Sequence, residues 1–331
     1  MNPAVSRLLA IVRHPLGALP TPLTPAPALG AAVGIPALWI KHDELIGFGF
    51  GGNKVRGLEF LLADALGKSA DVLITGAGAQ SNHVRATATC AAAFGMQAVA
   101  VYWGQEPAEV QGNLRLTRLV GAQTRFTGHA DRSQVDDAIR IEAERWLADG
   151  HVPYVIPRGG ACALGVLGHV VAAQELLQQC IARGMAPRHV VLAVGSGTTL
   201  AGWMLGTALW GAPWTVEGVT VSRPPSEVRS RVVSLIAEAA ALLGVTHAVV
   251  GDDIIVHDGF IGSDYGVPSR EGNAAIVLAA RTQGVFLDPT YTGKAFAGLT
   301  ALAQRGHWST AAPTVFIHTG GEPALFAHRV E

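Results

Sequence analysis

A glycine turn followed by a lysine is the first feature of the sequence that could do chemistry. The segment Gly51-Gly52-Asn53-Lys54 directly precedes an amphipathic helical pattern that starts near Val55. A helix N-terminus and an apolar environment both lower the pKa of an ammonium group, and the neutral amine can attack a carbonyl carbon to form an imine. Taken alone, the motif favours a surface lysine beside a helix cap, because short motifs match by chance.

A second polar segment is Thr75-Gly-Ala-Gly-Ala-Gln80-Ser81-Asn82-His83, which is typical of a strand end, a glycine turn and the start of a helix. Free backbone N–H groups at a helix start, together with the Ser81 hydroxyl and the Asn82 amide, can bind an anion such as a carboxylate. Ser and Asn are also ordinary N-caps, so this segment alone favours a cap.

The third segment, Gly195-Ser196-Gly197-Thr198-Thr199, lies between a hydrophobic strand pattern and a helix. Glycines let the main chain approach an oxyanion closely, and the threonine hydroxyls add donors, so the loop could bind a phosphate. The spacing differs from GxxxxGK[ST], which argues against a nucleoside triphosphate. A tight packing turn explains the loop equally well when it is taken alone.

One ligand explains all three segments together. An imine-forming lysine, a carboxylate site and a phosphate site fit a cofactor that carries an aldehyde and a phosphate and that acts on an amino acid. Each segment is ambiguous by itself, and their combination favours an enzyme.

Six motifs with a specific order and spacing extend this interpretation. They are Lys41-His42-Asp43-Glu44, Gly51-Gly52-Asn53-Lys54, Gln80-Ser81-Asn82-His83, Gly195-Ser196-Gly197-Thr198, Asp288-Pro289-Thr290-Tyr291-Thr292-Gly293-Lys294 and His318-Thr319-Gly320-Gly321. Over about residues 19–327, the chain resembles the D-cysteine desulfhydrase and 1-aminocyclopropane-1-carboxylate deaminase family. The resemblance implies pyridoxal 5′-phosphate as cofactor and a small amino acid as substrate.

The same resemblance implies the fold. That family has the tryptophan-synthase β-like α/β fold, fold type II among pyridoxal-phosphate enzymes. It has two open, twisted, mainly parallel sheets flanked by helices, with the cofactor in the cleft between two lobes. We expect residues 1–50 and 166–331 to form a large cofactor-binding domain and residues 51–165 a small domain. Members of the family commonly form dimers, so a homodimer is expected.

The resemblance also implies roles around the cofactor. Lys54 would carry the cofactor through an imine bond and move the α-proton of the substrate. Asn82 would donate a hydrogen bond to the ring oxygen, and Ser81, Asn82 and His83 would bind the substrate carboxylate. The loop of Gly195, Ser196, Gly197, Thr198 and Thr199 would bind the phosphate.

The remaining roles concern hydroxyl groups. Tyr291 matches the family's active-site tyrosine and Tyr265 a second one, although a packed tyrosine with a satisfied hydroxyl is the alternative for each. Thr319 would face the pyridine nitrogen and leave it largely unprotonated, which favours elimination over transamination. The catalytic candidates are therefore Lys54, Ser81, Tyr265 and Tyr291.

Two positions separate the branches of the family. The deaminase branch typically carries a glutamate after the active-site tyrosine and a glutamine after Ser-Asn, whereas this chain has Thr292 and His83. Both residues resemble the desulfhydrase branch, whose reaction is α,β-elimination from a cysteine-like amino acid to give pyruvate and ammonia. Deamination of 1-aminocyclopropane-1-carboxylate, and elimination from L-cysteate, D-serine or a β-substituted aspartate, remain alternatives.

Three departures from the family pattern leave the substrate open. Gly57 stands where the family often has a lysine that helps to bind the phosphate, and only Arg56 is nearby. Cys162 replaces a small polar residue, and we expect it to be packed. Arg158 would pair with an acidic substrate side chain if it points inward, and is an ordinary surface arginine if it points outward.

The elements that must position these residues follow an α/β pattern with mainly parallel strands. Apolar residues at spacings of three and four predict helices near 55–66 and 135–147. The proline-rich stretch 20–27 is expected to run extended across the surface. The uncharged segment 190–216 could span a bilayer by length, but Gly195 to Gly197 interrupt it, so a strand, a turn and a helix are expected. The clearest strand candidates are Asp71–Thr75, Gln97–Tyr102, Pro153–Ile156, His189–Val194, Val216–Val221 and Thr314–Ile317.

Composition excludes several other functions. With 331 residues, 49% hydrophobic and 15% charged, the chain can bury the cores of two lobes. A net charge of −1 predicts no nucleic-acid partner and no membrane surface. The three cysteines Cys90, Cys162 and Cys180 form neither a disulfide framework nor a metal motif, and the twelve histidines show no ligand spacing, so no metal and a cytoplasmic location are expected.

Two other classes of function were weighed. A nicotinamide-dependent oxidoreductase is suggested by Gly76-Ala-Gly78 after a strand, but the third glycine and the acidic residue about 20 positions on are missing. A non-catalytic amino-acid-binding protein with the same fold would be expected to have lost Lys54, which is present.

Overall fold

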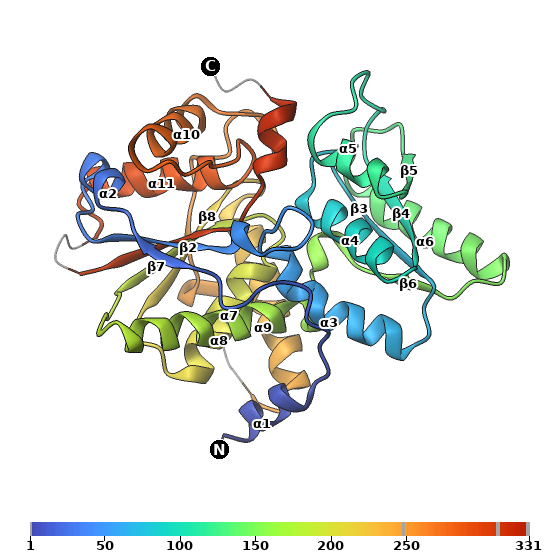
Figure 1. Ribbon diagram of the computed structural model, residues 1–331, viewed down its shortest axis with the longest axis horizontal. Coiled ribbons are helices and arrows are strands. Elements are labelled where there is room, and N and C mark those ends of the chain that lie inside the picture. The colour runs from blue at the N-terminus through green and yellow to red at the C-terminus, as the bar shows by residue number, and fades with distance from the viewer. Residues whose placement is uncertain (1, 247–248, 250, 309–311, 329–331) are drawn as a thin grey trace.

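Two parallel sheets organise the chain into two lobes (Figure 1). The computed structural model describes residues 2–246, 249, 251–308 and 312–328. The six-stranded sheet has the order β1-β2-β10-β7-β8-β9, and the four-stranded sheet has the order β5-β4-β3-β6. All neighbouring strands are parallel except β1 and β2, which are antiparallel. The predicted fold class is confirmed.

The large lobe is built around the six-stranded sheet, whose central strands are buried because helices cover both faces. Its strands are β1 (Leu23–Pro25), β2 (Leu38–His42), β7 (His189–Val194), β8 (Thr215–Thr220), β9 (Ile255–His257) and β10 (Thr314–His318). Its helices are α1 (Pro3–Ala10), α2 (Pro27–Val33), α7 (Ala163–Ala182), α8 (Thr198–Trp210), α9 (Pro225–Leu242), α10 (Arg270–Gln283) and α11 (Thr292–Gln304).

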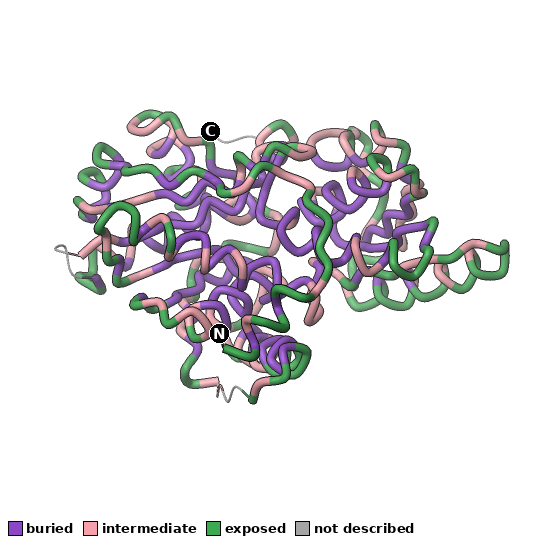
Figure 2. The backbone as a smooth tube through the Cα atoms, turned by 60° about the horizontal axis from the view of Figure 1, so that its bottom comes forward, coloured by how far each residue is buried: buried purple, intermediate pink, exposed green. Residues whose placement is uncertain are grey.

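The helices of the large lobe divide between the faces of its sheet. A buried cluster that includes Leu176, Trp203 and Ile236 joins α7, α8 and α9 to one face. A second cluster that includes Leu29, Ile276 and Phe296 joins α2, α10 and α11 to the other. Figure 2 shows the resulting buried interior along the length of the lobe. The 3-10 turns of this lobe are Asp43–Leu45, Gly251–Asp253 and Glu322–Ala327.

The small lobe is built around the four-stranded sheet. Its strands are β3 (Val72–Ala77), β4 (Gln97–Tyr102), β5 (Gln123–Phe126) and β6 (Pro153–Val155), and its helices are α4 (Asn82–Ala93), α5 (Gly112–Leu119) and α6 (Gln134–Ala148). Helix α3 (Lys54–Gly67) connects the lobes, since it packs against both α7 and α4. A 3-10 turn at Arg158–Gly160 returns the chain to the large lobe.

Most predicted elements agree with the structure to within two residues. Strands β4 and β7 have the predicted bounds, and the apolar segment 190–216 forms β7, a glycine turn and α8, as expected. No helix in the described part of the chain is long and apolar enough to cross a bilayer. The domain boundaries at residues 50 and 165 stay a prediction.

The proline-rich stretch differs from the expectation in one respect. It is extended, and Leu23–Pro25 pairs with β2, but the side chains of Thr21, Leu23 and Ala26 are buried rather than lying on the surface. The pairing with β2 places one face of the extended chain against the sheet and its core, so the segment is an edge strand of the large lobe.

Candidate active site

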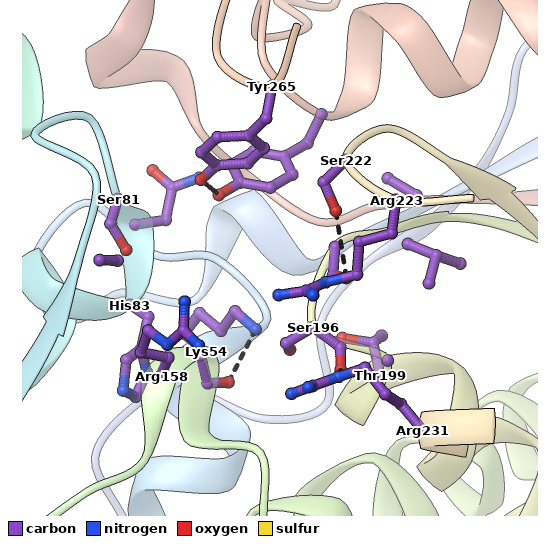
Figure 3. Close-up of a pocket in the computed structure, with 18 of the residues that line it drawn as sticks. Lys54, Ser81, His83, Arg158, Ser196, Thr199, Ser222, Arg223, Arg231 and Tyr265 are labelled. Carbon is purple, nitrogen blue, oxygen red and sulfur yellow. Dashed lines mark hydrogen bonds between the residues drawn. The ribbon is translucent and has the colours of Figure 1, made fainter. Parts of the chain in front are cut away.

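A cavity of about 490 Å³ lies where the carboxyl ends of the two sheets face each other (Figure 3). This is the position at which open α/β sheets bind ligands. Of the residues predicted for the site, only Thr198 is missing from the lining of this cavity. Those that line it are Lys54, Ser81, Asn82, His83, Gly195, Ser196, Gly197, Thr199, Tyr265, Tyr291 and Thr319.

Lys54 is the first residue of α3, and a glycine turn fixes where this helix starts. Gly51 and Gly52 have positive φ angles of 59° and 96°, which glycine adopts without a steric cost. The backbone N–H of Asn53 donates to the carbonyl oxygen of Thr319 at 3.0 Å, and a Cβ on Gly320 would lie 2.7 Å from the Cα of Gly52. The turn that carries the lysine is therefore packed directly on the loop that follows β10.

The Lys54 amine points into the cavity and donates to the carbonyl oxygen of Gly159 at 3.0 Å (Figure 3). Burial lowers the pKa of Lys54 to about 8, because the charged ammonium loses its hydration. A minor but appreciable fraction of the amine is therefore neutral near physiological pH. This is the protonation state that the sequence analysis required for imine formation.

A buried group of charges anchors the start of α3 to the large lobe. Arg56 donates to the carboxylates of Asp43 and Glu175, with its Nη2 atom 2.7 Å from Asp43 and 3.0 Å from Glu175. Lys41 also pairs with Glu175, and all four side chains are at most 9% exposed. Truncating one member of such a group leaves an uncompensated buried charge, which is strongly destabilising. Arg56 is thus committed to these carboxylates and does not replace the missing phosphate-binding lysine.

The glycine at position 57, where the family often has a lysine, has a steric explanation. A Cβ on Gly57 would lie 2.8 Å from the carbonyl oxygen of Gly165, and a Cβ on Gly168 would lie 2.2 Å from the carbonyl oxygen of Arg56. Helices α3 and α7 cross here with their backbones in contact, which only glycine permits. A lysine at position 57 is incompatible with this packing.

Ser81, Asn82 and His83 begin α4 on the opposite wall of the cavity. The Ser81 hydroxyl accepts from the backbone N–H of Val84 at 3.3 Å, so Ser81 is the N-cap that its residue type favours, and it lines the cavity as well. The His83 ring lies 3.2 Å from the hydroxyl of Thr75, and burial together with the nearby Lys54 charge lowers its pKa to about 3. His83 is therefore neutral.

Asn113 and Arg85 are two residues that the sequence analysis missed. The Asn113 side-chain amide donates to Asn82 Oδ1 at 2.9 Å, and Asn113 Oδ1 accepts from Arg85 Nε at 2.9 Å. Because the carbonyl oxygen of the Asn82 amide accepts this bond, its NH₂ group is free to donate into the cavity. Arg85 also donates to the carbonyl oxygens of Gly49 and Gly51 and so braces the turn before Lys54. Asn113 and Asn82 are 31 residues apart, and no local motif marks the pair.

The loop after β7 forms the third wall. Gly197 has a φ of 91°, and the loop leads into α8, whose N-terminal N–H groups face the cavity side of the sheet. The Thr199 hydroxyl accepts from the Asn53 side chain at 2.9 Å, which connects this loop to the lysine turn. Thr198 is turned away: its hydroxyl lies 3.0 Å from that of Ser196, and it lines a small neighbouring cavity.

Two tyrosines close the cavity from the large lobe. The hydroxyl groups of Tyr265 and Tyr291 are hydrogen-bonded to each other. Burial raises the pKa of both, that of Tyr291 well above its ordinary value, so both hydroxyls stay protonated. One hydroxyl proton forms the hydrogen bond between the two oxygens, and the other is available for donation to a ligand. The satisfied pair also fits the packing alternative, so the tyrosine roles stay predictions.

Asp288 positions Tyr291 at the start of α11. Its buried carboxylate accepts from the backbone N–H groups of Thr290, Tyr291 and Thr292 and from the Thr292 hydroxyl, at 2.7 to 3.0 Å. Lys294, one turn further, donates to the carbonyl oxygens of Ile261 and Asp264, and so fixes the segment that carries Tyr265. The motif 288–294 therefore holds the two tyrosines in position.

Arginine side chains gather at the rim of the cavity. Arg132, Arg158, Arg223 and Arg231 all line it. Arg158 is held by Asp136 at 2.7 and 2.5 Å, and Arg132 stacks over the Tyr265 ring at 5.2 Å. Arg158 therefore points toward the rim, neither deep in the cavity nor fully into solvent. Cys162 packs against the core of the small lobe, and burial raises the pKa of its thiol, so a nucleophilic role has no support.

The arrangement fits a phosphorylated aldehyde. A Cβ built on Gly159 would lie 2.7 Å from the Ser196 side chain and 3.8 Å from Lys54 Nζ. Because residue 159 is a glycine, this space between the Lys54 amine and the loop after β7 is left unfilled. The amine on one side and backbone N–H groups with arginines on the other match the two ends of pyridoxal phosphate. Lys54 would bind the aldehyde carbon, and Gly195–Thr199 with Arg231 would hold the phosphate.

Comparisons with known proteins agree with this geometry. The model of the family described as pyridoxal-phosphate dependent enzyme matches residues 15–320. The chain is 41% identical over 314 residues to a D-cysteine desulfhydrase of Salmonella choleraesuis, covering 93% of this chain and 94% of that protein. It is 42% identical over 299 residues to a D-cysteine desulfhydrase of Yersinia enterocolitica, covering 88% of each.

A solved structure gives the same result at the level of the fold. A crystal structure described as that of an ACC deaminase homologue has a TM-score of 0.90 and 36% identity, and the match covers 99% of this chain and 97% of that one. From the matched family model, the relatives and the lysine cavity together, we conclude that this chain belongs to the pyridoxal-phosphate dependent enzymes, with the fold type II architecture.

Proposed function

We propose that this enzyme catalyses α,β-elimination on a small cysteine-like amino acid, with D-cysteine as the first candidate and pyruvate, ammonia and sulfide as products. The observation that carries the proposal is the Lys54 amine, with a pKa lowered to about 8, in a cavity between an anion-binding helix start and a glycine loop. The desulfhydrases of Salmonella and Yersinia, at 41% and 42% identity, support this choice of substrate.

The bound cofactor supplies an electron sink for the negative charge that develops at the substrate Cα. Lys54 would hold the cofactor, and its amine, when free, would accept the α-proton of the substrate at Nζ. Its neutral form is accessible near physiological pH because burial has lowered its pKa. The start of α3, anchored by Arg56, keeps the amine in place through both roles.

Substrate binding is assigned to the start of α4. The Ser81 hydroxyl, the free N–H groups of the first helical turn and the amide of Asn82 would bind the carboxylate, and Asn82 would also donate to the ring oxygen. The neutral His83 adds no charge at this wall, so the carboxylate is held by dipoles and hydrogen bonds. The packing of Asn113 against Asn82 supports this orientation.

The tyrosine pair is assigned to the leaving group. Because Tyr265 and Tyr291 stay protonated and share one hydrogen bond, the remaining hydroxyl can donate to the departing thiolate. Thr319 would face the ring nitrogen with a neutral hydroxyl, and its carbonyl oxygen already holds the lysine turn. A neutral group at this position favours rapid expulsion of the β-substituent.

The first prediction tests the lysine. Lys54→Ala should abolish the visible absorption band of the bound cofactor and reduce pyruvate and sulfide formation from D-cysteine to background, because the only attachment for the aldehyde is removed. Lys68→Ala, at the exposed end of the same helix, is the matched control and should leave both unchanged. A Lys54→Ala protein that retains the band and turnover would contradict the proposal.

A second candidate function, elimination of an acidic β-substituent as in L-cysteate, is favoured by the arginines at the rim. Burial lowers the pKa of Arg231, and the neighbouring Arg223 and Arg158 lower it further, so a bound anion would relieve repulsion among these cations. We would compare sulfide release from D-cysteine with sulfite release from L-cysteate, with D-serine and 1-aminocyclopropane-1-carboxylate in the same panel. Selective loss of L-cysteate turnover in Arg158→Ala would favour this candidate.

The setting of the enzyme is part of the proposal. We infer a homodimer in the cytoplasm, which the family resemblance and the three free thiols support. Size-exclusion chromatography with light scattering would measure the mass of the particle. A monomer that keeps full activity would contradict the dimer.

A further inference from the structure

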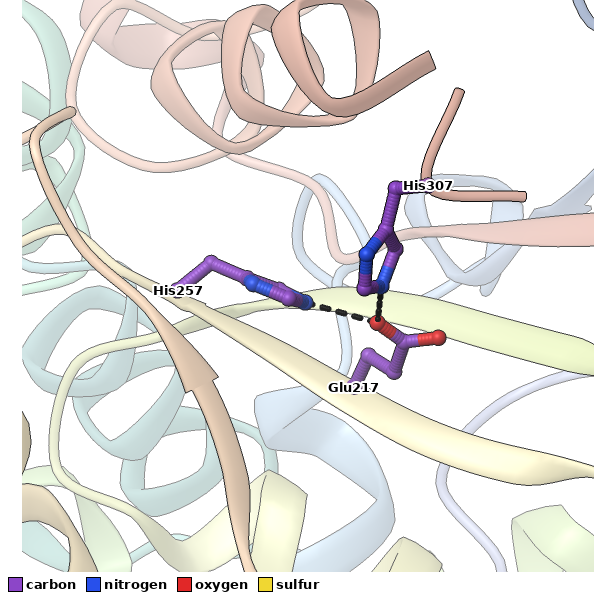
Figure 4. A group of neighbouring side chains, drawn as sticks. All are labelled: Glu217, His257 and His307. Carbon is purple, nitrogen blue, oxygen red and sulfur yellow. Dashed lines mark hydrogen bonds and ion pairs between the residues drawn. The ribbon is translucent and has the colours of Figure 1, made fainter. Parts of the chain in front are cut away.

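A second group of chemically capable side chains lies on the large sheet near the amino-terminal ends of β7 and β8, away from the lysine cavity at the carboxyl ends of these strands. Its centre is Glu217, the third residue of β8, whose side chain is 1% exposed. The other members come from separate segments: His257 ends β9, and His307 follows α11 (Figure 4). Nothing in the proposed reaction uses them, and their distant positions in the chain conceal the group from any motif search.

Both oxygens of Glu217 are held. Its Oε2 atom lies 2.6 Å from His257 Nε2 and 2.9 Å from His307 Nε2. Its Oε1 atom lies 2.7 Å from His189 Nδ1 and accepts from the Trp308 indole N–H at 2.9 Å. Figure 4 shows both imidazoles directed at the same carboxylate oxygen.

The plain alternative is a buried carboxylate that is satisfied by hydrogen bonds alone. The four lone pairs of the carboxylate then meet four donors, His189 and Trp308 at Oε1 and His257 and His307 at Oε2. A metal site is favoured by the convergence of two imidazoles and one carboxylate oxygen from three separate segments on one point that is open to solvent at His307. Three ligand atoms, one from each of Glu217, His257 and His307, lie within 4.8 Å of one another.

The chemistry of the three ligands selects the ion. Imidazole nitrogens with one carboxylate suit Zn²⁺ and related divalent transition metals, while Mg²⁺ and Ca²⁺ prefer oxygen alone. Metal–ligand bonds of about 2.0–2.2 Å in a tetrahedron place ligand atoms roughly 3.3 Å apart. The oxygen–nitrogen separations of 2.6 and 2.9 Å must therefore open by roughly 0.7 and 0.4 Å to reach that spacing. His307, whose side chain is 38% exposed, has room to move.

The surroundings match those of a metal ligand. In metal sites, the second oxygen of a ligating carboxylate is itself hydrogen-bonded, which fixes its orientation. His189 and Trp308 do this for Oε1 of Glu217. The exposure of His307 gives an ion a path from solvent, and a water molecule could take the fourth position.

We propose that Glu217, His257 and His307 form a binding site for one Zn²⁺ ion per chain, which joins β8, β9 and the segment after α11. The ion would replace two hydrogen bonds by coordinate bonds across three segments of the large lobe. Its role is structural, because the site lies on the sheet away from the lysine cavity. The site does not rest on the proposed lyase activity.

The test uses the holoenzyme, freed of metal with a chelator and then dialysed against Zn²⁺. We expect one Zn²⁺ per chain by elemental analysis and a rise in melting temperature that grows with free Zn²⁺, because the ion binds only the folded state. In the double variant His257→Asn, His307→Asn, both effects should disappear. Circular dichroism and the cofactor band must show that this variant is folded.

Matched controls separate this site from adventitious binding. His151→Asn removes an imidazole that also pairs with a carboxylate, Asp71, at 2.8 Å, and it should still bind one Zn²⁺. Cys162→Ser should do the same, which excludes the thiol. His189→Asn should weaken binding roughly 10- to 100-fold, as loss of an outer-shell partner does. The proposal is overturned if the wild-type chain binds no Zn²⁺, or if the double variant binds it equally well.

Discussion

At the scale of single residues, the protonation of Lys54 governs how the enzyme acquires its cofactor. The amine is partly enclosed, and burial is the cause of its lowered pKa. The charged form cannot attack an aldehyde, so the pH at which the amine loses its proton sets the pH at which the apoenzyme captures the cofactor.

A pH profile tests this directly. The rate of cofactor capture by the apoenzyme should rise with pH and level off above about 8, because Lys54 is then mostly neutral. A free lysine side chain, whose pKa is 10.5, should continue to gain reactivity well beyond that point. The measurement is the growth of the visible cofactor band after mixing, over a series of buffers. A profile for the enzyme that coincides with that of the free side chain would show that burial does not tune this amine.

Asn113 gives a second prediction at this scale. Asn113→Ala should lower kcat/KM roughly tenfold, or about 1.4 kcal/mol, because the Asn82 amide loses the partner that orients it. Asn113→Asp keeps an acceptor for Arg85 but cannot donate to Asn82, so it should share the loss. The exposed amide Gln105 provides the control, Gln105→Ala. The readouts are steady-state kinetics and the position of the cofactor band, and an unchanged band with unchanged kinetics would assign Asn113 to packing alone.

Residues with local signals could be predicted and residues with non-local partners could not. Lys54, Ser81 and the loop at 195–199 follow strands or start helices, and their types alone suggest a site. Arg85 and Asn113 act through partners from other segments, and periodicity carries no information about such pairs. Arg56 is the cation nearest to the missing lysine in the sequence, and nothing local in the sequence shows that its buried carboxylate partners lie 13 and 119 residues away.

At the scale of elements, the contact between α3 and α7 decides how the lysine helix is held. Gly57, Gly165 and Gly168 let the two helix backbones touch, and the ion pair between Arg56, next to Gly57, and Glu175, further along α7, joins the same helices. The lysine is thereby fixed to the large lobe, while Ser81 and Asn82 start from the small lobe.

Substitution at Gly57 measures this contact. Gly57→Ala should lower the free energy of unfolding by about 1–3 kcal/mol, because the added methyl would lie 2.8 Å from the carbonyl oxygen of Gly165 and force the helices apart. Gly67→Ala, at the open end of the same helix, has nothing within 4 Å and should be neutral or stabilising by up to about 1 kcal/mol. Denaturant unfolding of both variants is the measurement. Equal stability of the two would show that the close approach at Gly57 is relaxed in solution.

Short or polar strands were among the elements that sequence patterns missed, together with the mostly buried strand β2 (Leu38–His42). Strands β1 and β9 have three residues each, and β5 is Gln123–Phe126, with every residue only partly buried. Alternation cannot be recognised over so few positions. The central strands β4 and β7 are longer and apolar, and they were predicted with their observed bounds.

At the scale of the whole molecule, the two lobes meet over the cavity through the segment that carries Tyr265. Arg132 of the small lobe pairs with Asp264 of the large lobe, and it stacks over the rings of Trp103 at 5.5 Å and Tyr265 at 5.2 Å. Such an exposed pair contributes at most about 1 kcal/mol to stability. The ion pair lies at the rim of the cavity, so we expect it to affect how the substrate enters the site.

Removing the charge at Asp264 tests this expectation. Asp264→Ala should raise KM severalfold and change kcat less than twofold, because the rim segment loses its link to the small lobe while the residues around the amine stay in place. The unfolding free energy should change by less than about 1 kcal/mol. Asp137→Ala, an exposed partner of Arg140 on α6, is the control and should alter neither constant. Unchanged KM in Asp264→Ala would mean that the rim stays closed without the ion pair.

The contrast between the glycine contacts and the arginine rim has a consequence for how this scaffold can acquire new substrates. The turn at Gly52 and the loop at Gly320 touch backbone to backbone, so a mutational library at those positions should yield few folded variants. The rim arginines Arg132, Arg158 and Arg223 lie outside that contact and, unlike Arg231, are not assigned to the phosphate, so we expect that each can be exchanged without disturbing the amine. Selectivity in descendants of this chain can therefore drift while the chemistry of cofactor attachment stays constant.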